Sequence, residues 1–163
     1  MSSLSAVVRE EISSQDEALA RVRDLLGLVA EEIDHLEPDL GGLYEHRPSL
    51  ERNSGVSWRG IETVCHVSAL LSSHREAPLG EDRRRRLFRG FDRSDATRSL
   101  HRHEDHLDSP LPRRIWTTPE GDRLEIASGV RLTVRAISAP YLPGSLSRSV
   151  STSPVTPPPR RIR

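Results

Sequence analysis

The fold of this 163-residue chain is decided by residues 121–137, which read GDRLEIASGVRLTVRAI. Leu124 and Ile126 alternate with polar residues, and after the Ser128-Gly129 turn a second run alternates in the same way, with apolar side chains at Val130, Leu132, Val134 and Ala136. Alternation with a period of two, bounded by turn residues, is typical of antiparallel strands that bury one face. Residues 114–138 are therefore predicted to form a sheet with one aliphatic side and one side that carries arginine.

A helix is predicted before this sheet, over residues 5–36. Its apolar residues recur at intervals of three and four, at Leu19, Val22, Leu26, Val29, Ile33 and Leu36, and Ile12 extends the pattern by one heptad. Pro38 and the Gly41-Gly42 pair end the helix. Two arrangements are compatible with this stripe: an amphipathic helix packed on its own domain, or a short coiled coil between chains.

Between the helix and the sheet, the sequence predicts a loop and then a second helix. Residues 39–56 contain proline, asparagine and glycine, which favours a loop. Ser57 is a suitable N-cap for a helix that extends to about Ser73, with Cys65 as a buried thiol on its apolar side. From residue 139 onward the chain is rich in proline, serine and threonine, and this composition predicts a disordered tail.

These elements predict an α+β fold in three parts. An amphipathic heptad helix occupies residues 1–40. Residues 54–138 form the core, an antiparallel β-sheet with helices packed on one side, and residues 139–163 form the disordered Ser/Pro/Arg-rich tail. The apolar fraction of 34% agrees with this division, because it is below the roughly 45% of a typical globular domain and leaves only a small core.

The charged residues are unevenly distributed, although the chain has 24 basic and 24 acidic residues. Every basic residue is an arginine; residues 1–40 carry 3 of them with 10 acids, and residues 121–163 carry 7 with 2 acids. A basic rear half favours a polyanionic partner. No run of about 18 apolar residues and no secretory leader is found, and a single cysteine excludes a disulfide framework, so we expect a soluble, non-secreted protein without membrane contact.

One histidine-rich stretch, HRHEDH at residues 101–106, matches the HxHxDH pattern of metallo-β-lactamase-type hydrolases. Such a site needs a buried apolar strand before the motif and further histidines after it, and the sequence supplies neither. We therefore interpret this stretch as a solvated polar loop. No nucleophile–base spacing and no glycine-rich phosphate loop occurs, so the sequence predicts no enzyme, no catalytic residue, no metal, no cofactor and no small-molecule substrate.

Arginines gather at positions 83–89, interleaved with apolar residues. The cluster is either a solvated run of charge or a phosphate-binding surface, because guanidinium groups bind phosphate oxygens bidentately. Arg131, Thr133 and Arg135 alternate along one predicted strand and therefore share a face. Such a face suits A-form RNA, which is bound through its shape, phosphates and 2′-hydroxyls. Trp58 is either a core anchor or a plate that stacks on a terminal base.

Several short blocks occur in a characteristic order over roughly residues 54–138. They are GVSW at 55–58, PLG at 78–80, RLFR at 86–89 followed by Asp92-Arg93 and Ala96, SLHR at 99–102, Trp116, and GVRLTV at 129–134. Together they resemble the tombusvirus core RNA-silencing suppressor family, which includes shorter relatives in aureusviruses. The resemblance implies a homodimer whose joined sheets hold a small interfering RNA duplex, with tryptophans of an N-terminal helix capping the duplex ends.

The resemblance also implies an RNA-binding surface on particular residues. Trp58 stands where the family has its first capping tryptophan, but Ile61 replaces the second, which favours looser selection of duplex length. The family's basic pair that contacts phosphates corresponds to Arg85 and Arg86, and further arginines of that surface correspond to Arg89 and Arg102. Its small hydroxyl residues that face the RNA correspond to Arg131 and Arg135, which flank Thr133. The family's C-terminal dimerisation helix has no counterpart in residues 139–163. We expect the heptad helix to take over part of the self-association.

The sequence thus predicts a viral suppressor of RNA silencing that sequesters double-stranded small interfering RNA as a homodimer in the cytoplasm of a host plant cell. The alternative is a viral interaction or movement-type protein. It would self-associate through the N-terminal helix and use a basic rear half to bind nucleic acid.

Overall fold

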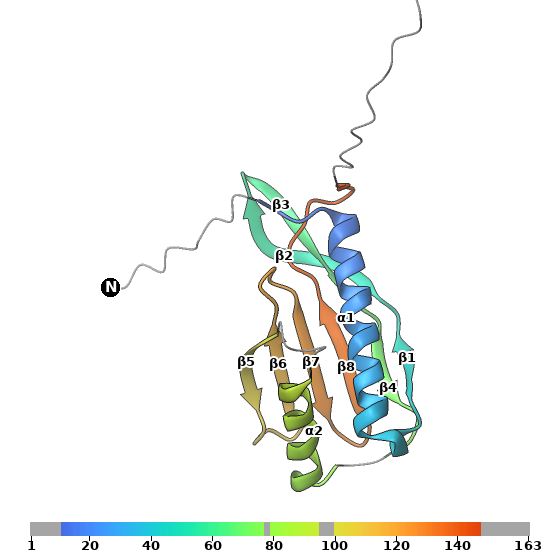
Figure 1. Ribbon diagram of the computed structural model, residues 1–163. Helices are drawn as coiled ribbons and strands as arrows, with labels where there is room; N and C mark the ends of the chain where they lie inside the picture. The colour runs from blue at the N-terminus through green and yellow to red at the C-terminus, as the bar shows by residue number, and fades with distance from the viewer. Residues whose placement is uncertain (1–10, 77–78, 95–99, 148–163) are drawn as a thin grey trace, which may run out of the picture.

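In a computed structural model, which describes residues 11–76, 79–94 and 100–147, two helices lie on one face of an antiparallel sheet (Figure 1). The helices are α1 (Gln15–Leu36) and α2 (Glu81–Arg93), and a 3-10 turn, η1 (Pro38–Leu40), follows α1. Within the described residues the sheet has eight strands: β1 (Leu43–Arg47), β2 (Leu50–Trp58), β3 (Ile61–Val67), β4 (Leu70–Ser73), β5 (His101–His106), β6 (Arg113–Thr117), β7 (Arg123–Ser128) and β8 (Leu132–Ile137). The predicted α+β class is confirmed.

The strands are arranged in the order β1-β4-β8-β7-β6-β5, and β3 pairs with both β2 and β8. β6, β7 and β8 form a meander in which Trp116 lies opposite Leu124, and Leu124 lies opposite Ala136. These three side chains belong to the core beneath the helices. The strands predicted from alternation are therefore confirmed, although Val130 lies in the turn before β8 and is exposed rather than inward-facing.

β2 and β3 form a hairpin where the sequence predicts a loop and a helix. Their two-residue turn is Arg59-Gly60, with φ angles of 48° and 78°, as in a type I′ hairpin turn. The helix predicted over 57–73 is wrong, because strands occupy this segment. Glycine at position 60 favours the turn, since it adopts this backbone readily and weakens a helix interior. The loop predicted over 39–56 is wrong across β1 and β2, which are strands. β2 is hard to recognise from the sequence, because it is mostly exposed and lacks apolar alternation. Cys65 is buried, as predicted, but on β3.

The HRHEDH stretch forms β5, an edge strand of the sheet, and not the predicted polar loop. Edge strands commonly carry charged side chains, which discourage pairing with another chain. The pairing of β5 with β6 sets Asp105 opposite Arg114. A strand of this composition has no hydrophobic period, so its sequence resembles that of a loop.

α1 begins at Gln15, ten residues later than the sequence predicts. Ser14 is the N-cap: its hydroxyl accepts from the Glu17 amide and the Glu17 carboxylate accepts from the Ser14 amide, which forms a reciprocal capping box. Heptad residues Val22, Val29 and Ile33 are at most 2% exposed and pack in one core with the sheet. The packing of this helix on its own domain is therefore confirmed, and residues 15–36 share a single core with the segment 54–138.

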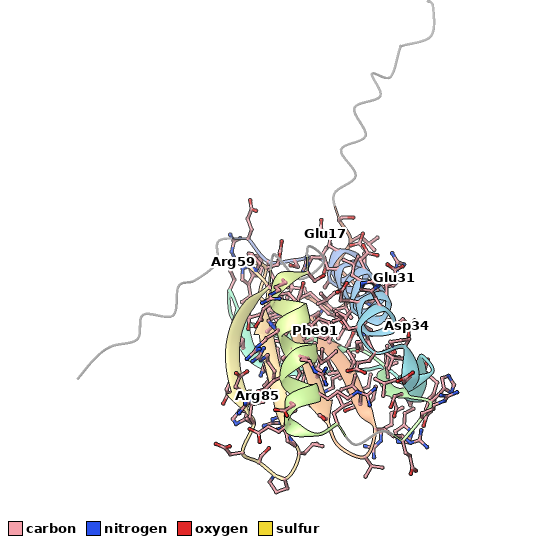
Figure 2. All side chains as sticks on the ribbon, turned by 60° about the horizontal axis from the view of Figure 1, so that its bottom comes forward. Glu17, Glu31, Asp34, Arg59, Arg85 and Phe91 are labelled. Atoms are coloured by element: carbon pink, nitrogen blue, oxygen red, sulfur yellow. The ribbon has the colours of Figure 1, made fainter. Side chains whose placement is uncertain are left out.

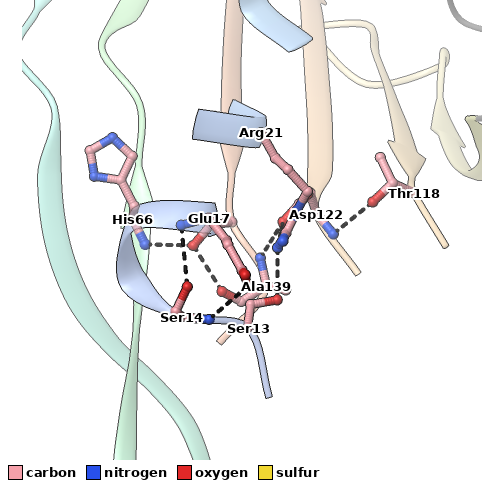
Figure 3. Close-up of polar contacts among 9 residues, drawn as sticks. Ser13, Ser14, Glu17, Arg21, His66, Thr118, Asp122 and Ala139 are labelled. Atoms are coloured by element: carbon pink, nitrogen blue, oxygen red, sulfur yellow. Dashed lines mark hydrogen bonds and ion pairs between the residues drawn. The ribbon is translucent and has the colours of Figure 1, made fainter. Parts of the chain in front are cut away.

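A buried carboxylate joins α1, the sheet and the C-terminal segment (Figure 3). Asp122 lies between β6 and β7 and is 2% exposed. It accepts hydrogen bonds from Nε of Arg21 at 2.8 Å and from the Ala139 amide at 2.7 Å. The bond with Asp122 raises the pKa of Arg21, whose Nη2 also donates to Ser13. Three distant parts of the sequence therefore depend on one side chain.

Residues 139–147, which the sequence predicts as the start of a disordered tail, are packed on the domain. Tyr141 is fully buried and exchanges two backbone hydrogen bonds with Val64. Its hydroxyl donates to the Glu51 carboxylate at 2.7 Å. Ser147 donates its amide proton to Asp16 in the first turn of α1. The tail prediction is therefore wrong for residues 139–147, and residues 148–163 lie outside the described residues.

We expect the contact between α1 and Ser147 to depend on pH. Hydrogen bonds from Ser14 and Ser147 lower the pKa of Asp16 to about 2, from a usual 3.8. Because the folded pKa is the lower one, the stabilisation is present above pH 4 and is lost as the pH falls through about 2. The melting temperature of Asp16→Asn should therefore decline less than that of the wild type between pH 4 and pH 2. Asp24→Asn, a change at an exposed carboxylate of the same helix, should decline like the wild type.

Candidate nucleic-acid interface

α2 presents an apolar side to the sheet and a basic side to solvent. Leu87, Phe88 and Phe91 are at most 2% exposed, and their spacing places them on one side of the helix. The rings of Phe88 and Phe91 lie 6.1 and 5.8 Å from the Trp116 ring of β6, measured between centroids. This aromatic packing fixes the rotation of α2 and therefore decides which of its arginines face solvent.

Arg85, Arg86 and Arg89, which the sequence predicts as RNA-binding, are exposed together on α2. Arg85 pairs with Glu81 at 2.5 Å, one helical turn earlier, and such an exposed pair contributes about 0.5 kcal/mol or less. Within the described part of the chain, Arg86 and Arg89 make no ion pair. Most of the charge on this side of α2 is therefore available to a ligand.

Arg83 has a different role, because it connects α2 to the end of α1. Its Nη2 lies 2.6 Å from the carboxylate of Glu37, a residue that is 8% exposed. The hydrogen bond to Glu37 raises the pKa of Arg83. This arginine of the predicted cluster is thus part of the structural framework.

A hollow of about 600 Å³ lies between α2 and the connection from β5 to β6. Its α2 wall follows one stripe of the helix, with Arg84, Arg85, Phe88 and Arg89 among the lining residues. Leu107 and Asp108 lie on the opposite wall. Arg85 and Arg89 therefore border a concave surface and not a flat one.

Arg114 of β6, which is not among the residues predicted to bind RNA, also lines this hollow. Its side chain is only 8% exposed; Nε donates to Asp105 at 2.7 Å and Nη1 lies 3.3 Å from Asp92. The guanidinium lies 4.7 Å above the Phe88 ring. One sequence signal could have found it: Arg114 is two residues before Trp116, so both point to the helix-covered side of the sheet.

Thr133 and Arg135 lie on the other face of the sheet. Leu132 and Val134 of the same strand pack in the core beneath the helices, so the residues that alternate with them point away. Arg135 pairs there with Glu125 of β7 at 3.2 Å. This part of the predicted RNA surface and the arginines of α2 are therefore separated by the sheet.

Arg131 lies just before β8 and is largely occupied by contacts within the chain. Its Nη1 donates to the carbonyl oxygens of Ser73 at 2.9 Å and His74 at 2.5 Å. Its Nη2 lies 3.5 Å from Glu76. The side chain thus stabilises the end of β4.

Trp58 lies at the β2–β3 turn and not at a helix start. Its ring is half-buried, with the Arg59 guanidinium 4.5 Å from the ring centroid, and Ile61 lies opposite it in the hairpin. Val56 and Ile61 are both more than half exposed. Arg59 in this turn and Arg85 of α2 lie at opposite ends of the molecule (Figures 1 and 2). Trp58 is therefore distant from the start of α2.

Arg102 lies on β5 opposite Trp116, but its side chain is not among those that the structure describes. Of the predicted RNA-binding residues, the structure thus brings together Arg85, Arg86 and Arg89. Trp58 lies elsewhere, and the residues of β8 are on the other face.

Among the residues that the structure describes, no three histidine, cysteine or carboxylate side chains are grouped as metal ligands are. In the same part of the chain, neither helix has the length and apolar character that a membrane span requires.

No family model matches the chain, and no curated protein sequence matches it. Among solved structures, the crystal structure of a DUF4853 family protein from Actinomyces odontolyticus is similar, with a TM-score of 0.58. The match covers 87% of this chain and 76% of that one, at 13% sequence identity. At this identity the likeness shows the fold alone: the chain shares its arrangement of helices and strands with a bacterial protein.

Proposed function

We propose that this chain is a non-enzymatic nucleic-acid-binding protein that contacts the phosphates of duplex RNA through the exposed arginines of α2. The observation that carries the proposal is the grouping of Arg85, Arg86 and Arg89 on the solvent side of one helix. Because buried aromatic residues hold this helix on the sheet, binding needs no ordering of a loop. Guanidinium groups then bind phosphate oxygens bidentately and without regard to base sequence.

The proposed surface is smaller than the one that the suppressor resemblance implies. A rigid duplex lies along one face of a protomer, and the β8 residues Thr133 and Arg135 face the opposite way from α2. We therefore place the RNA contact on α2 and leave the open face of the sheet out of it.

The specific form of this proposal follows the resemblance to RNA-silencing suppressors. The resemblance supports small interfering RNA as the ligand, a homodimer as the form that binds it, and sequestration of the RNA in the host-cell cytoplasm as the role. Self-association through the N-terminal helix, the alternative, has less support, because most of the heptad stripe packs in the core of its own chain.

The proposal is tested by replacing Arg85, Arg86 and Arg89 together with alanine. In a gel-shift assay with a short RNA duplex at low salt, we expect affinity to fall at least about tenfold. Each lost phosphate contact also removes about 0.9 from the slope of log affinity against log salt, so the slope should decrease by about 2 to 3.

The control is a triple alanine variant at Arg23, Arg47 and Arg123, three exposed arginines away from α2. It changes the net charge equally and should retain most of the affinity. Equal losses in both triple variants would mean that binding depends on overall charge. Loss only after replacement of Arg131 and Arg135 would move the site to the other face. Absence of duplex binding by the wild type at low salt would end the proposal.

A further inference from the structure

The hollow beside α2 combines fixed and unpaired positive groups. Of its carboxylates, Glu81 pairs with Arg85 at 2.5 Å, and Asp92 lies 3.3 Å from Arg114. Two other lining arginines, Arg84 and Arg89, make no ion pair with any residue that the structure describes. The hollow therefore has two guanidinium groups available to an anion from solvent.

We propose that this hollow binds a phosphate monoester, with the phosphate held between Arg84 and Arg89. A monoester carries a charge of about −1.5 to −2 at neutral pH and has three outer oxygens, so two guanidinium forks can bind it at once. A phosphodiester has only one negative charge and two such oxygens. The pair of free arginines thus favours the end of a chain, or a free nucleotide, over an internal phosphate.

Arg114 gives the hollow a rigid polar floor. Its side chain is held by Asp105, lies over the Phe88 ring and is more than nine-tenths buried. Asp105 and Asp92 balance its charge, so the attraction for an anion comes from Arg84 and Arg89. Because the Arg114 side chain is already fixed, the floor of the hollow needs no further side-chain ordering when a ligand binds.

The size and lining of the hollow indicate more than a bare phosphate ion. Its volume of about 600 Å³ lies within the range of small-molecule sites. Leu107, which is half-buried, supplies apolar lining. A mononucleotide-sized body therefore fits, with its sugar or base near Leu107 and its phosphate at the arginines.

One group in the hollow opposes an anion. Asp108 is exposed and lines the wall across from α2. Its carboxylate repels a phosphate, and we expect Asp108→Asn to bind a monoester more tightly than the wild type by a few fold.

This inference rests on the proposed function only through Arg85 and Arg89, which belong to both the hollow and the proposed RNA surface. The experiment therefore uses Arg84, which lines only the hollow, and Arg86, which belongs only to the RNA surface. Isothermal titration of the full chain with AMP should show saturable binding that adenosine lacks. Arg84→Ala should reduce AMP affinity at least about tenfold and leave most duplex RNA binding intact. Arg86→Ala, at an exposed arginine outside the hollow, should weaken duplex binding and leave AMP binding unchanged.

Two further readouts locate the phosphate and its source. AMP binding should weaken below about pH 6, where a monoester loses its second charge. A 5′-phosphorylated RNA that binds more tightly than the same RNA with a 5′-hydroxyl supports a chain end as the source. Equal binding of these two RNAs, together with AMP binding, supports a free nucleotide. Equal binding of AMP and adenosine, or no saturable AMP binding while duplex RNA still binds, overturns the site and leaves the proposed function standing.

Discussion

Replacing Asp122 with alanine is expected to lower the free energy of unfolding by about 3 kcal/mol, and the melting temperature by about 10 °C. The change leaves the Arg21 guanidinium without its partner and the Ala139 amide without its acceptor. Removing one member of a buried ion pair typically costs about 3–5 kcal/mol. We expect the lower value because the Arg21 side chain is 27% exposed, so water screens its charge in the variant.

Urea denaturation followed by circular dichroism measures this effect. Asp122→Asn should lose less stability than Asp122→Ala, because its amide oxygen can still accept from Ala139. Asp24→Ala, at a carboxylate 72% exposed on α1, should change stability by less than about 0.5 kcal/mol. A loss below about 1 kcal/mol in Asp122→Ala would contradict the role of this carboxylate in joining three parts of the chain.

Val29→Asp is expected to prevent folding, with a loss of about 4 kcal/mol or more. Val29 is fully buried in the core between α1 and the sheet. A carboxylate there would lose its hydration and lie among the apolar members of this core. Circular dichroism should show loss of the native spectrum at every protein concentration, because the damage is within one chain.

The neighbouring residue provides a matched control. Leu28 is 45% exposed, and Leu28→Asp should leave the fold and its stability nearly unchanged. If α1 instead formed a coiled coil between chains, substitutions in α1 would dissociate the oligomer. Dilution of the wild type would then cause the same loss of the native spectrum. Light scattering and circular dichroism over a range of concentrations separate these outcomes.

How far the fold could be predicted depends on how each segment is buried. β7 and β8 were predictable, because Leu124 and Val134 belong to runs that alternate between core and solvent. β2 was not, since both of its faces are largely exposed and the period is absent. The β2–β3 turn has a clear signal in Gly60, but the apolar residues that follow also fit a helical stripe. Local spacing alone does not decide between these two structures.

For the candidate site, the sequence predicts which residues lie on the same helix or strand. It does not predict which helices and strands lie on the same face of the sheet. The cluster that contains Arg85 and Arg89 is recognisable, and so is the common face of Thr133 and Arg135. That α2 covers the opposite face of the sheet depends on how Phe91 and the helix-facing strand residues pack. Arg114 was missed because an arginine beside apolar strand residues looks like a solvent-facing position until its partners are known.

The packing of residues 139–147 against the start of α1 has a consequence for how the protein is made. Tyr141 pairs with Val64 and with Ser13, which lies just before α1. The start of the described chain therefore depends on residues near its end. Contacts this distant in sequence form late and slow the search for the native state. On the ribosome, α1 emerges before the strands that cover its apolar side, and the contacts at its start wait until residues 139–147 leave the exit tunnel. Folding is therefore completed only once residues 139–147 have left the exit tunnel, and the nascent chain is most exposed to aggregation before then.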